Sequence, residues 1–453
     1  MKPVPSVRIS ALRLLREAAN PIRLRTELFS TYGEIVRVKL GRRELIYTSH
    51  PEHLEQILGE QEPRFMRRAA LLTESLAEIG GRNVSVFISN DLQRWIHDRR
   101  TALMSFDDKS HFRSYAETIA ARTATHLDSW SRRFRDHSEI DIETEINTMV
   151  VDMVLNTLFS NMGVESPEIR DLIAQASHAI TERIRAVNPL PWRLPTATRA
   201  RYRKTLGRAQ AVTQAIVERR LDHGQDYDDL LGNFLYHTRY PGGPDRARLV
   251  EDVTYHVNSL IGVGFFTTAT LVHWSLVMLS RFPELERQLA AEIEQALGDR
   301  PPRYEDLPRM PFIQAFLKEV LRLYPSTLNI NRQSAEAGEV AGYWIPKHAD
   351  IIGSIYHVHR HRDFWSNPEG FDPQRFVDRP LGQDHHYAYV PFGGGKRACI
   401  GRSFALMEAT IMVAMIVQRA RLSMLPHTTI GQTFPTIITM RPDVTTMRIH
   451  FKH

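Results

Sequence analysis

The chain has 453 residues, of which 42% are hydrophobic and 24% charged, so it can bury a large core in one big domain or in two to three ordinary ones. Its single cysteine excludes an internal disulfide framework and fits a reducing compartment. The 58 Lys and Arg residues exceed the 52 Asp and Glu residues by 6, and because no nucleic-acid motif accompanies this excess, an acidic protein partner is favoured over nucleic acid.

The N-terminal segment carries no apolar run of about 20 residues, so we expect no membrane anchor and a cytoplasmic protein. Its arginines faintly suggest a transit peptide, but Glu17 follows them closely and a globular pattern begins near Tyr32. From there, alternating apolar and polar residues with many β-branched side chains predict a small hairpin with strands at 35–40 and 44–48.

Most of the remaining chain has helical spacing, and its longest helix is predicted over about residues 249–280, which corresponds to roughly 45 Å. A second group of short strands is predicted at 342–346 and 350–354, and the apolar stretch 405–417, interrupted by Glu408, predicts a buried core helix. No internal repeat or linker is evident, so the predicted fold class is mainly α with small β-sheets. The expected buried positions of the long helix are Leu249, Val253, Val257, Leu260, Ile261, Gly264 and Thr268.

Glu319 and Arg322 lie one turn apart on a predicted helix, where a carboxylate and a guanidinium can pair. The spacing alone is weak, because other acid–arginine pairs match it on what we expect to be solvated helix faces. The context of Glu319 distinguishes it, since it precedes Cys399 by 80 residues and a segment containing Arg375 lies between them.

Cys399 lies in a glycine-rich loop at 392–401 with the sequence FGGGKRACIG. A metal-bound thiolate needs closely approaching backbone N–H groups, and the glycines at 393–395 and Gly401 permit the necessary turns. Phe392 would shield the sulfur from water. The alternative is an inert buried thiol, the commoner fate of a lone cysteine. Five fixed residue types at these spacings would match by chance in one of ~10⁴ chains.

The loop resembles the haem-binding signature of the cytochrome P450 family, FxxGxRxCxG, in every fixed position, and the resemblance covers nearly the whole chain. It implies the cytochrome P450 fold in a single domain over residues 1–453. It also implies haem b, with the Cys399 thiolate on the iron and Arg397 at a propionate. Glu319, Arg322 and Arg375 resemble the Glu-Arg-Arg triad of the family, a buried ion network expected to stabilise the scaffold rather than to perform chemistry.

Other residues resemble further haem partners of the family. Trp95 and Arg99 resemble its Trp-xxx-Arg helix, which faces the haem propionates. Arg332 and His359 fall where the family commonly has additional propionate partners. Each of these residues could instead be an ordinary surface or capping residue.

The long helix departs from the family at one position. P450 oxygenases usually carry Ala/Gly-Gly-x-Asp/Glu-Thr-Thr there, and the acid and first threonine relay protons to bound dioxygen. Gly264 and Thr267 keep this pattern, but Phe266 occupies the acid position and cannot relay a proton. Three explanations stay open: a polar substrate group or water held by Thr267, an acid from elsewhere in the fold, or chemistry without dioxygen activation, such as peroxide use or a rearrangement.

The resemblance implies a haem-thiolate monooxygenase that oxidises a hydrophobic small molecule with dioxygen. The segments that line the family's pocket, 84–88, 260–268, 328–331 and 434–436, are mostly apolar here. They favour a terpenoid of secondary metabolism, with a fatty acid or polyketide as alternatives. A haem sensor or carrier without turnover is the alternative from another functional class.

Only about 54 residues follow Cys399, so we expect no fused reductase and electrons from a ferredoxin or flavodoxin with its own reductase. A basic patch on the cysteine side could dock such an acidic partner. Its expected members are Arg94, Arg100, Lys396 and Arg402.

Overall fold

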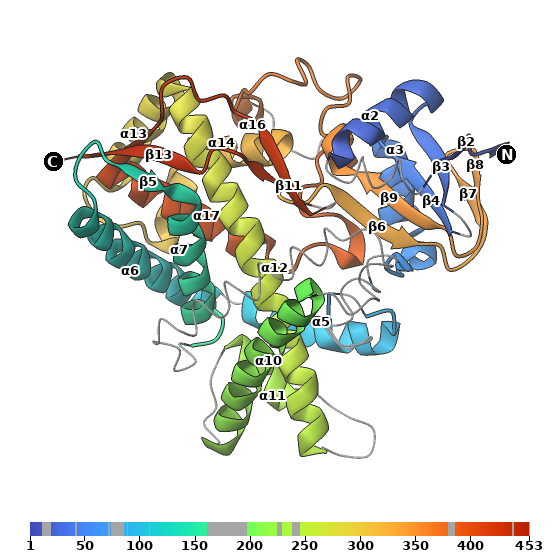
Figure 1. Cartoon of the computed structure of the whole chain (residues 1–453), viewed down its shortest axis with the longest axis horizontal. Helices are drawn as coiled ribbons and strands as arrows, with labels where there is room; N and C mark the ends of the chain where they lie inside the picture. Colours follow the sequence, from blue (N-terminus) through green and yellow to red (C-terminus); the bar gives the residue numbers. More distant parts are fainter. Residues whose placement is uncertain are drawn as a thin grey trace.

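The structure is a computed structural model in which helices fill one side of the molecule and most of the β-structure the other (Figure 1). The predicted class, mainly α with small sheets, is confirmed. The structure describes residues 1–10, 20–40, 43–70, 73, 86–87, 89–107, 109–160, 197–223, 229–237, 245–378, 386–436 and 439–452.

The described helices are α2 (Pro21–Tyr32), α3 (Pro51–Glu55), α5 (Leu92–Asp107), α6 (Lys109–Arg133), α7 (Ile142–Thr157), α10 (Ala197–His223), α11 (Leu230–His237), α12 (Arg246–Arg281), α13 (Pro283–Leu297), α14 (Pro311–Leu323), α15 (Ile355–Val358), α16 (Arg375–Asp378) and α17 (Arg402–Arg419). The described strands are β1 (Lys2–Pro3), β2 (Ser6–Arg8), β3 (Ile35–Leu40), β4 (Arg43–Thr48), β5 (Glu139–Asp141), β6 (Asn329–Gln333), β7 (Gly338–Val340), β8 (Tyr343–Ile345), β9 (Asp350–Ser354), β10 (Ala420–Met424), β11 (Gln432–Thr436), β12 (Thr439–Pro442) and β13 (Thr446–Phe451).

The largest described sheet has the strand order β2-β3-β4-β9-β6. Its β3–β4 hairpin is antiparallel, with Ile35 opposite Thr48, as the alternating pattern predicts. The second predicted group of strands is divided: β8 pairs with β1 and β7, whereas β9 pairs with β4 and β6. The reason is burial. All five residues of β9 are buried, so this strand is stable with a partner on each side.

The long helix α12 confirms the predicted central helix and is slightly longer than expected. Its 36 residues correspond to roughly 54 Å, and it packs against α7, α10, α14 and α17. Asp245 caps its first turn by accepting a hydrogen bond from the N–H of Ala247, and the helix ends before Pro283. It is also long and apolar enough to span a membrane, but 67% of its most apolar stretch is buried inside the protein.

Helix α17 confirms the core helix predicted from the apolar stretch at 405–417. Its side chains are buried on nearly every side, between α6, α12, α13 and α14. The side chain of Glu408 is therefore buried in the same core as its apolar neighbours.

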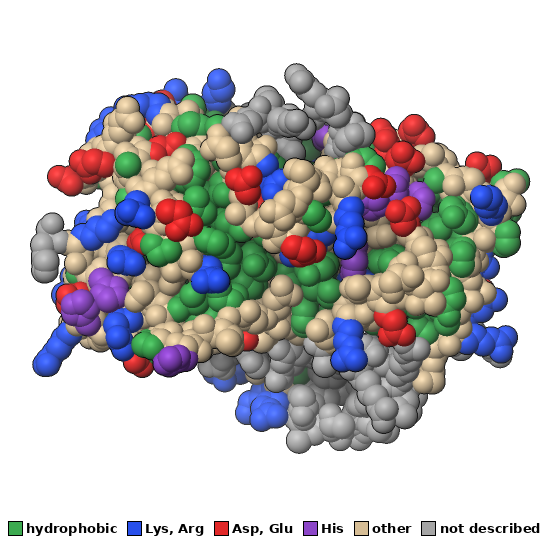
Figure 2. All heavy atoms as spheres, turned by 90° about the horizontal axis from the view of Figure 1, so that it is seen from above, with side chains coloured by type: hydrophobic (Ala, Val, Ile, Leu, Met, Phe, Trp, Pro, Cys, Tyr) green, Lys and Arg blue, Asp and Glu red, His purple; other side chains and the backbone are tan. Residues whose placement is uncertain are grey.

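The surface seen in Figure 2 has charged side chains of both signs around a band of hydrophobic side chains that crosses the middle of the face. Apolar atoms contribute much of the accessible surface of folded proteins. The net charge of +6 is thus not concentrated in one patch on this face.

Candidate active site

The loop around Cys399 is closed by its own backbone. The N–H of Cys399 donates to the carbonyl of Phe392 at 2.9 Å, and the N–H of Ala398 donates to Gly395 O at 3.0 Å. A short 3-10 turn, Gly395–Arg397, lies between them. These bonds fix the cysteine directly before α17.

Two of the loop glycines are required by conformation. Gly393 and Gly395 have φ of 71° and 66°, in the left-handed region that favours glycine. A Cβ on Gly395 would also collide with Leu58 O and the carboxylate of Glu62. Gly401 has an ordinary φ of −88° and open space around it. Neither its backbone conformation nor crowding by the described residues therefore requires glycine, contrary to the prediction.

The thiol of Cys399 is exposed, yet desolvation by the surrounding protein raises its pKa. From these two observations together we infer that the side chain faces an interior recess. A hydrogen bond from Gly401 and the charges of Arg99, Arg402 and Arg68 oppose this rise. The recess thus presents a sulfur and positive charge together, and a metal ion that binds the sulfur would deprotonate it.

Three predicted arginines come together beside this recess. Arg99 donates from Nη2 to Ala398 O at 2.8 Å, and Arg332 donates from Nη2 to Gly394 O at 3.4 Å. Arg397 is 5% exposed and donates to Ser89 O at 2.6 Å. Its Nε and Nη1 atoms are buried and have no hydrogen-bond partner among the described residues.

Arg68 is a fourth member that the sequence does not reveal. Its Nε donates to Phe87 O at 3.1 Å. Burial lowers the pKa of Arg68 to about 10 and that of Arg397 to about 9, and repulsion among the arginines contributes. Burial and the same repulsion lower the pKa of Arg332. Crowded guanidinium groups, with unused N–H donors on the buried Arg397, are suited to an anionic ligand.

Trp95 supports these arginines from one side. Its indole N–H donates to Val86 O at 3.0 Å, so this donor is directed to the protein backbone. The guanidinium carbons of Arg397 and Arg99 lie 4.4 Å and 5.6 Å from the centre of the ring. Trp95 therefore positions the two cations by cation–π contacts.

His359 has a structural role in this structure. The N–H of Val390 donates to its Nε2 at 2.9 Å, and Nδ1 lies 3.1 Å from the carbonyl oxygen of Arg322. Burial lowers the pKa of His359 to about 3, so its ring is neutral and Nδ1 donates to that carbonyl. Both ring nitrogens are used by the backbone, and we omit His359 from the proposed anion-binding residues.

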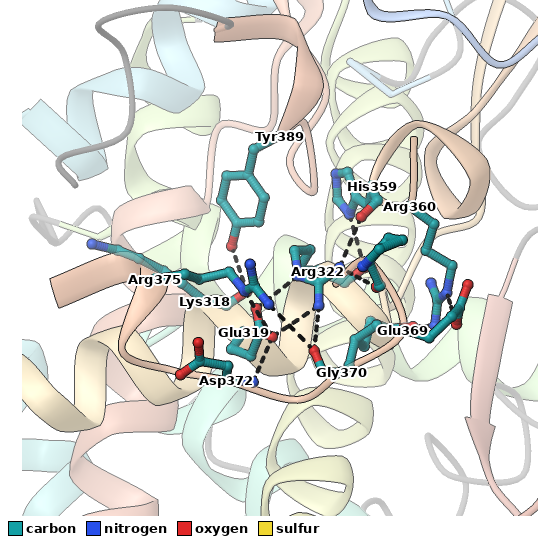
Figure 3. A network of polar contacts seen from close by, with 12 residues as sticks. Lys318, Glu319, Arg322, His359, Arg360, Glu369, Gly370, Asp372, Arg375 and Tyr389 are labelled. Atoms are coloured by element: carbon teal, nitrogen blue, oxygen red, sulfur yellow. Dashed lines mark hydrogen bonds and ion pairs between the residues drawn. The ribbon is translucent and has the colours of Figure 1, made fainter. Parts of the chain in front are cut away.

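The predicted ion network is present (Figure 3). Glu319 accepts from Arg322 Nε at 2.7 Å and from Arg375 Nε at 3.1 Å, and the N–H of Asp372 donates to it at 2.8 Å. Glu319 and Arg322 are both 0% exposed. Arg322 also donates to Pro368 O at 2.6 Å, so the network ties α14 to the segment that leads to α16.

On α12, the predicted residues separate onto two faces. The hydroxyl of Thr267 donates to Val263 O at 3.0 Å on the face that includes Gly264. Phe266 points the other way, because three-and-four spacing places it with Ala269 and Thr270. This side of α12 lines a small cavity with Glu143, Ile146, Asn147, Phe266, Ala269, Thr270, His273 and Arg441.

Two buried acids near these elements were not predicted as site residues. Asp98 of α5 has a pKa raised to about 7, mainly by burial, and it lies 3.5 Å from both Arg94 Nε and His256 Nε2. Glu408 of α17 has a pKa raised to about 8 by burial and lies beside Thr268. The only sequence signal for Glu408 is that it interrupts an apolar run.

The expected basic patch loses one member. Arg94 pairs with Asp252 at 2.7 Å and with Asp98, so its charge is compensated inside the protein. Arg100, Lys396 and Arg402 are exposed. The pocket segment predicted at 84–88 lies largely outside the described residues.

The comparisons with known proteins agree with one another. The family model "Cytochrome P450" matches residues 3–447. Cyclooctatin synthase of Streptomyces melanosporofaciens is 28% identical over 409 residues, covering 88% of this chain and 85% of that protein. Cyclooctat-9-en-7-ol 5-monooxygenase of the same organism is 28% identical over 404 residues, covering 88% and 84%.

Two further similarities extend the comparison. Pentalenene oxygenase of Streptomyces avermitilis is 28% identical over 401 residues, covering 88% of this chain and 86% of that protein. The solved structure of retinoic acid bound cyanobacterial CYP120A1 has a TM-score of 0.85 over 100% of both chains. At 19% identity, this likeness concerns the fold.

Proposed function

The chain belongs to the cytochrome P450 family, and from this premise we propose that it oxidises a hydrophobic terpenoid with haem b in the cytoplasm. Membership makes it a haem-iron monooxygenase, and relatives are named as monooxygenase and oxygenase. The observation that carries the proposal is the exposed but desolvated Cys399 thiol beside two buried arginines, Arg332 and Arg397, and two partly buried ones, Arg68 and Arg99.

The residues of the recess fit haem. The Cys399 sulfur would bind the iron, and Arg68, Arg99, Arg332 and Arg397 would bind the acidic propionates. The free Nε and Nη1 atoms of Arg397 support this assignment, because buried donors need acceptors. Bound haem supplies dioxygen activation and transfer of one oxygen atom to the substrate.

The protein's own contribution is binding, orientation and proton handling. Gly264 leaves open space beside α12, with nothing within 4 Å of a Cβ placed there. Thr267 on the same face carries a hydroxyl that can hold water or a polar group of the substrate, whereas Phe266 offers neither donor nor acceptor. We therefore assign proton positioning at the reacting site to Thr267.

A terpenoid substrate is supported by chemistry and by the relatives. The names of three relatives refer to cyclooctatin, cyclooctat-9-en-7-ol and pentalenene. In this chain, Leu328 is buried and Leu260 partly buried on segments expected to line the pocket, and Asn331 adds a polar group. Such a lining suits a compact apolar molecule oriented by one or two hydrogen bonds.

The substrate proposal is tested with pentalenene and cyclooctat-9-en-7-ol as probes, supplied with NADPH, a ferredoxin and its reductase. We expect each probe that is a substrate to stimulate NADPH consumption. Mass spectrometry should then show a product with one added oxygen atom. Faster oxidation of a fatty acid would reject the terpenoid class. Product formed with peroxide but not with NADPH would instead support the peroxide-using alternative. Tight binding of a probe without turnover would support the haem sensor or carrier.

Removing the Thr267 hydroxyl should uncouple the reaction. In Thr267→Ala, product per NADPH should fall, by up to about 10²-fold, because a positioned proton donor typically contributes ~10²–10⁴-fold. Thr270→Ala is the matched control, since its hydroxyl bonds Phe266 O on the other face of α12. Equal coupling in the wild type and Thr267→Ala would contradict the role of Thr267.

We also propose that an acidic ferredoxin or flavodoxin docks on Arg100, Lys396 and Arg402. Lys396 lies in the Cys399 loop, Arg402 directly follows this loop, and Arg100 lies on α5 beside Arg99. Reduction by ferredoxin should then slow as salt rises, because exposed charges are screened over about 8–10 Å. Stopped-flow reduction of Arg402→Glu should be slower at low salt than that of Arg132→Glu, which changes an exposed arginine on α6. A salt-independent rate, or equal rates in both variants, would reject this docking surface.

A further inference from the structure

Two clusters of the described residues bring together three side chains of the kinds that bind metal ions, and both lie outside the candidate active site. Within each cluster, the candidate ligand atoms lie within 4.8 Å of one another. The clusters are Glu34, His50 and His361, and Asp136, His137 and His450. The second ring nitrogen of each histidine distinguishes them, because a histidine that binds a metal through one nitrogen normally donates the N–H of the other.

In the first cluster, both nitrogens of each ring are already used. His50 Nδ1 accepts the backbone N–H of Glu52 at 3.2 Å. His361 Nδ1 accepts the backbone N–H of Asp363 at 3.4 Å. The two Nε2 atoms therefore carry the ring protons, and they lie 3.8 Å and 2.7 Å from the Glu34 carboxylate. A metal ion would have to displace these protons, so this cluster is a hydrogen-bonded contact and a poor metal site.

In the second cluster, the outer nitrogen of each ring has a partner that can accept. His137 Nε2 lies 3.1 Å from the Asp136 carboxylate, which only accepts, so this nitrogen carries the ring proton. His450 Nε2 lies 2.8 Å from Ser423 Oγ, a hydroxyl that can donate or accept. The two Nδ1 atoms face each other at 2.8 Å. When both rings are neutral, His137 Nδ1 presents a lone pair, and one proton on His450 Nδ1 lies between the rings.

The spacing of the two Nδ1 atoms fits a metal ion with ligands at right angles. Imidazole nitrogens bind first-row metal ions at about 2.0 Å, so two of them lie about 2.8 Å apart at an angle of about 90° and about 3.3 Å apart at a tetrahedral angle. Right angles are typical of the tetragonal sites of Cu²⁺ and Ni²⁺, and Cu²⁺ has the highest affinity of the divalent first-row ions. The observed 2.8 Å therefore favours Cu²⁺ over tetrahedral Zn²⁺.

The backbone holds the two rings together. His137 lies in the turn between α6 and β5, and β5 pairs with β13 near the C-terminal end of the chain (Figure 1). Its φ of 63° is in the left-handed region, which residues other than glycine seldom adopt. The N–H of His137 donates to Ile449 O at 2.8 Å, and the N–H of Phe451 donates to Asp136 at 2.9 Å. The turn is thus bound to β13 on both sides of His450, so metal binding requires little further ordering.

The charges around the two rings permit a cation to bind. The arginines that share this face of the β10–β13 pair, Arg421 and Arg448, each pair with a glutamate, at 3.2 Å and 3.5 Å. The Asp136 carboxylate adds a negative charge beside His137. The side chain of His137 is 69% exposed, so an ion can reach its Nδ1 atom from the solvent.

We propose that His137 and His450 form a surface binding site for Cu²⁺, with both Nδ1 atoms as ligands and with Asp136 and Ser423 orienting the rings. The ion takes the place of the proton between the rings. The His450 proton moves from Nδ1 to Nε2, and the Ser423 hydroxyl changes from donor to acceptor, so the neutral pair releases no proton. The bound ion links the turn before β5 to β13, and the site is independent of the proposed haem chemistry.

Isothermal titration of the haem-loaded protein with Cu²⁺, with glycine as a competing ligand, tests the site. We expect one tight site in the wild type and weaker binding of Zn²⁺. Loss of a direct ligand in His450→Gln or in His137→Gln should weaken this site by more than ~100-fold, because loss of an outer partner alone typically costs about 10–100-fold. His361→Gln is the matched control from the first cluster and should leave the tight site unchanged.

An equally tight site in His137→Gln and His450→Gln would overturn the proposal, as would loss of this site in His361→Gln. Asp136→Asn provides a test that keeps both ligands, should a glutamine variant fail to fold. This change should weaken Cu²⁺ binding by about 10–100-fold, since the His137 N–H loses its carboxylate acceptor. Unchanged affinity in Asp136→Asn would likewise reject the site.

Electron paramagnetic resonance identifies the ligands of the ion. The difference between spectra of the haem-loaded protein with and without one equivalent of Cu²⁺ should show a tetragonal copper signal split by two nitrogen ligands. The signal should be lost in the double variant His137→Gln/His450→Gln. The same signal in the double variant, or a wild-type signal without nitrogen splitting, would mean adventitious copper only and would reject the proposal.

Discussion

Replacing Cys399 with alanine should abolish the absorbance band near ~450 nm that the family membership leads us to expect for the reduced, carbon-monoxide-bound protein. The methyl group of alanine cannot bind iron, and Cys399 is the only cysteine in the chain. The arginines around the recess remain, so haem should still be retained in part, but without a thiolate ligand. The measurement is the reduced, carbon-monoxide difference spectrum of purified protein.

The control separates loss of the ligand from loss of the fold. Far-ultraviolet circular dichroism of Cys399→Ala should match the wild type, because the thiol is exposed in the recess and contributes little to the packed core. A full band in the variant would show that another residue ligates the iron. The assignment of Cys399 would then be wrong.

Replacing Glu319 with alanine should give little soluble holoprotein. The change leaves Arg322, which is fully buried, and Arg375 without their carboxylate, and breaking a buried ion pair in this way typically costs about 3–5 kcal/mol. The Asp372 N–H also loses its acceptor. Urea unfolding and haem content per protein provide the measurement.

Glu294→Ala is the matched control for this change. Glu294 is exposed on α13, so its loss should alter the free energy of unfolding by only about ±0.5 kcal/mol. If Glu319→Ala instead unfolds at the same urea concentration as the wild type and carries a full complement of haem, the network does not stabilise the haem-side scaffold.

The local elements of this fold were accessible from sequence because each depends on residues close together in the chain. The β3–β4 hairpin follows from alternation, α12 from apolar spacing and a terminal proline, and the Cys399 turn from glycines at 393 and 395. The triad was also found, since Glu319 and Arg322 are one helical turn apart and the family pattern adds Arg375.

Other features could not be read from the sequence because they depend on contacts between distant segments. The sequence places Arg94 in the expected basic patch, but in the fold this arginine forms an ion pair with Asp252 of α12. His359 resembles a haem-binding residue of the family in the sequence. In the fold, however, its two ring nitrogens are hydrogen-bonded to Val390 N–H and to Arg322 O. Nothing in the residues around Arg68 marks it as a neighbour of Arg397.

The sequence by itself determined the helices and turns around Cys399 and the prediction that this residue ligates haem iron, because a glycine-rich loop and an amphipathic helix are specified by residue type at short spacing. Only the tertiary structure decided which charges are compensated and which are left without partners. Burial acts on a side chain through all segments that pack around it. This is why Glu319 is paired with two arginines, whereas burial raises the pKa of Glu408, which has no such partner among the described residues.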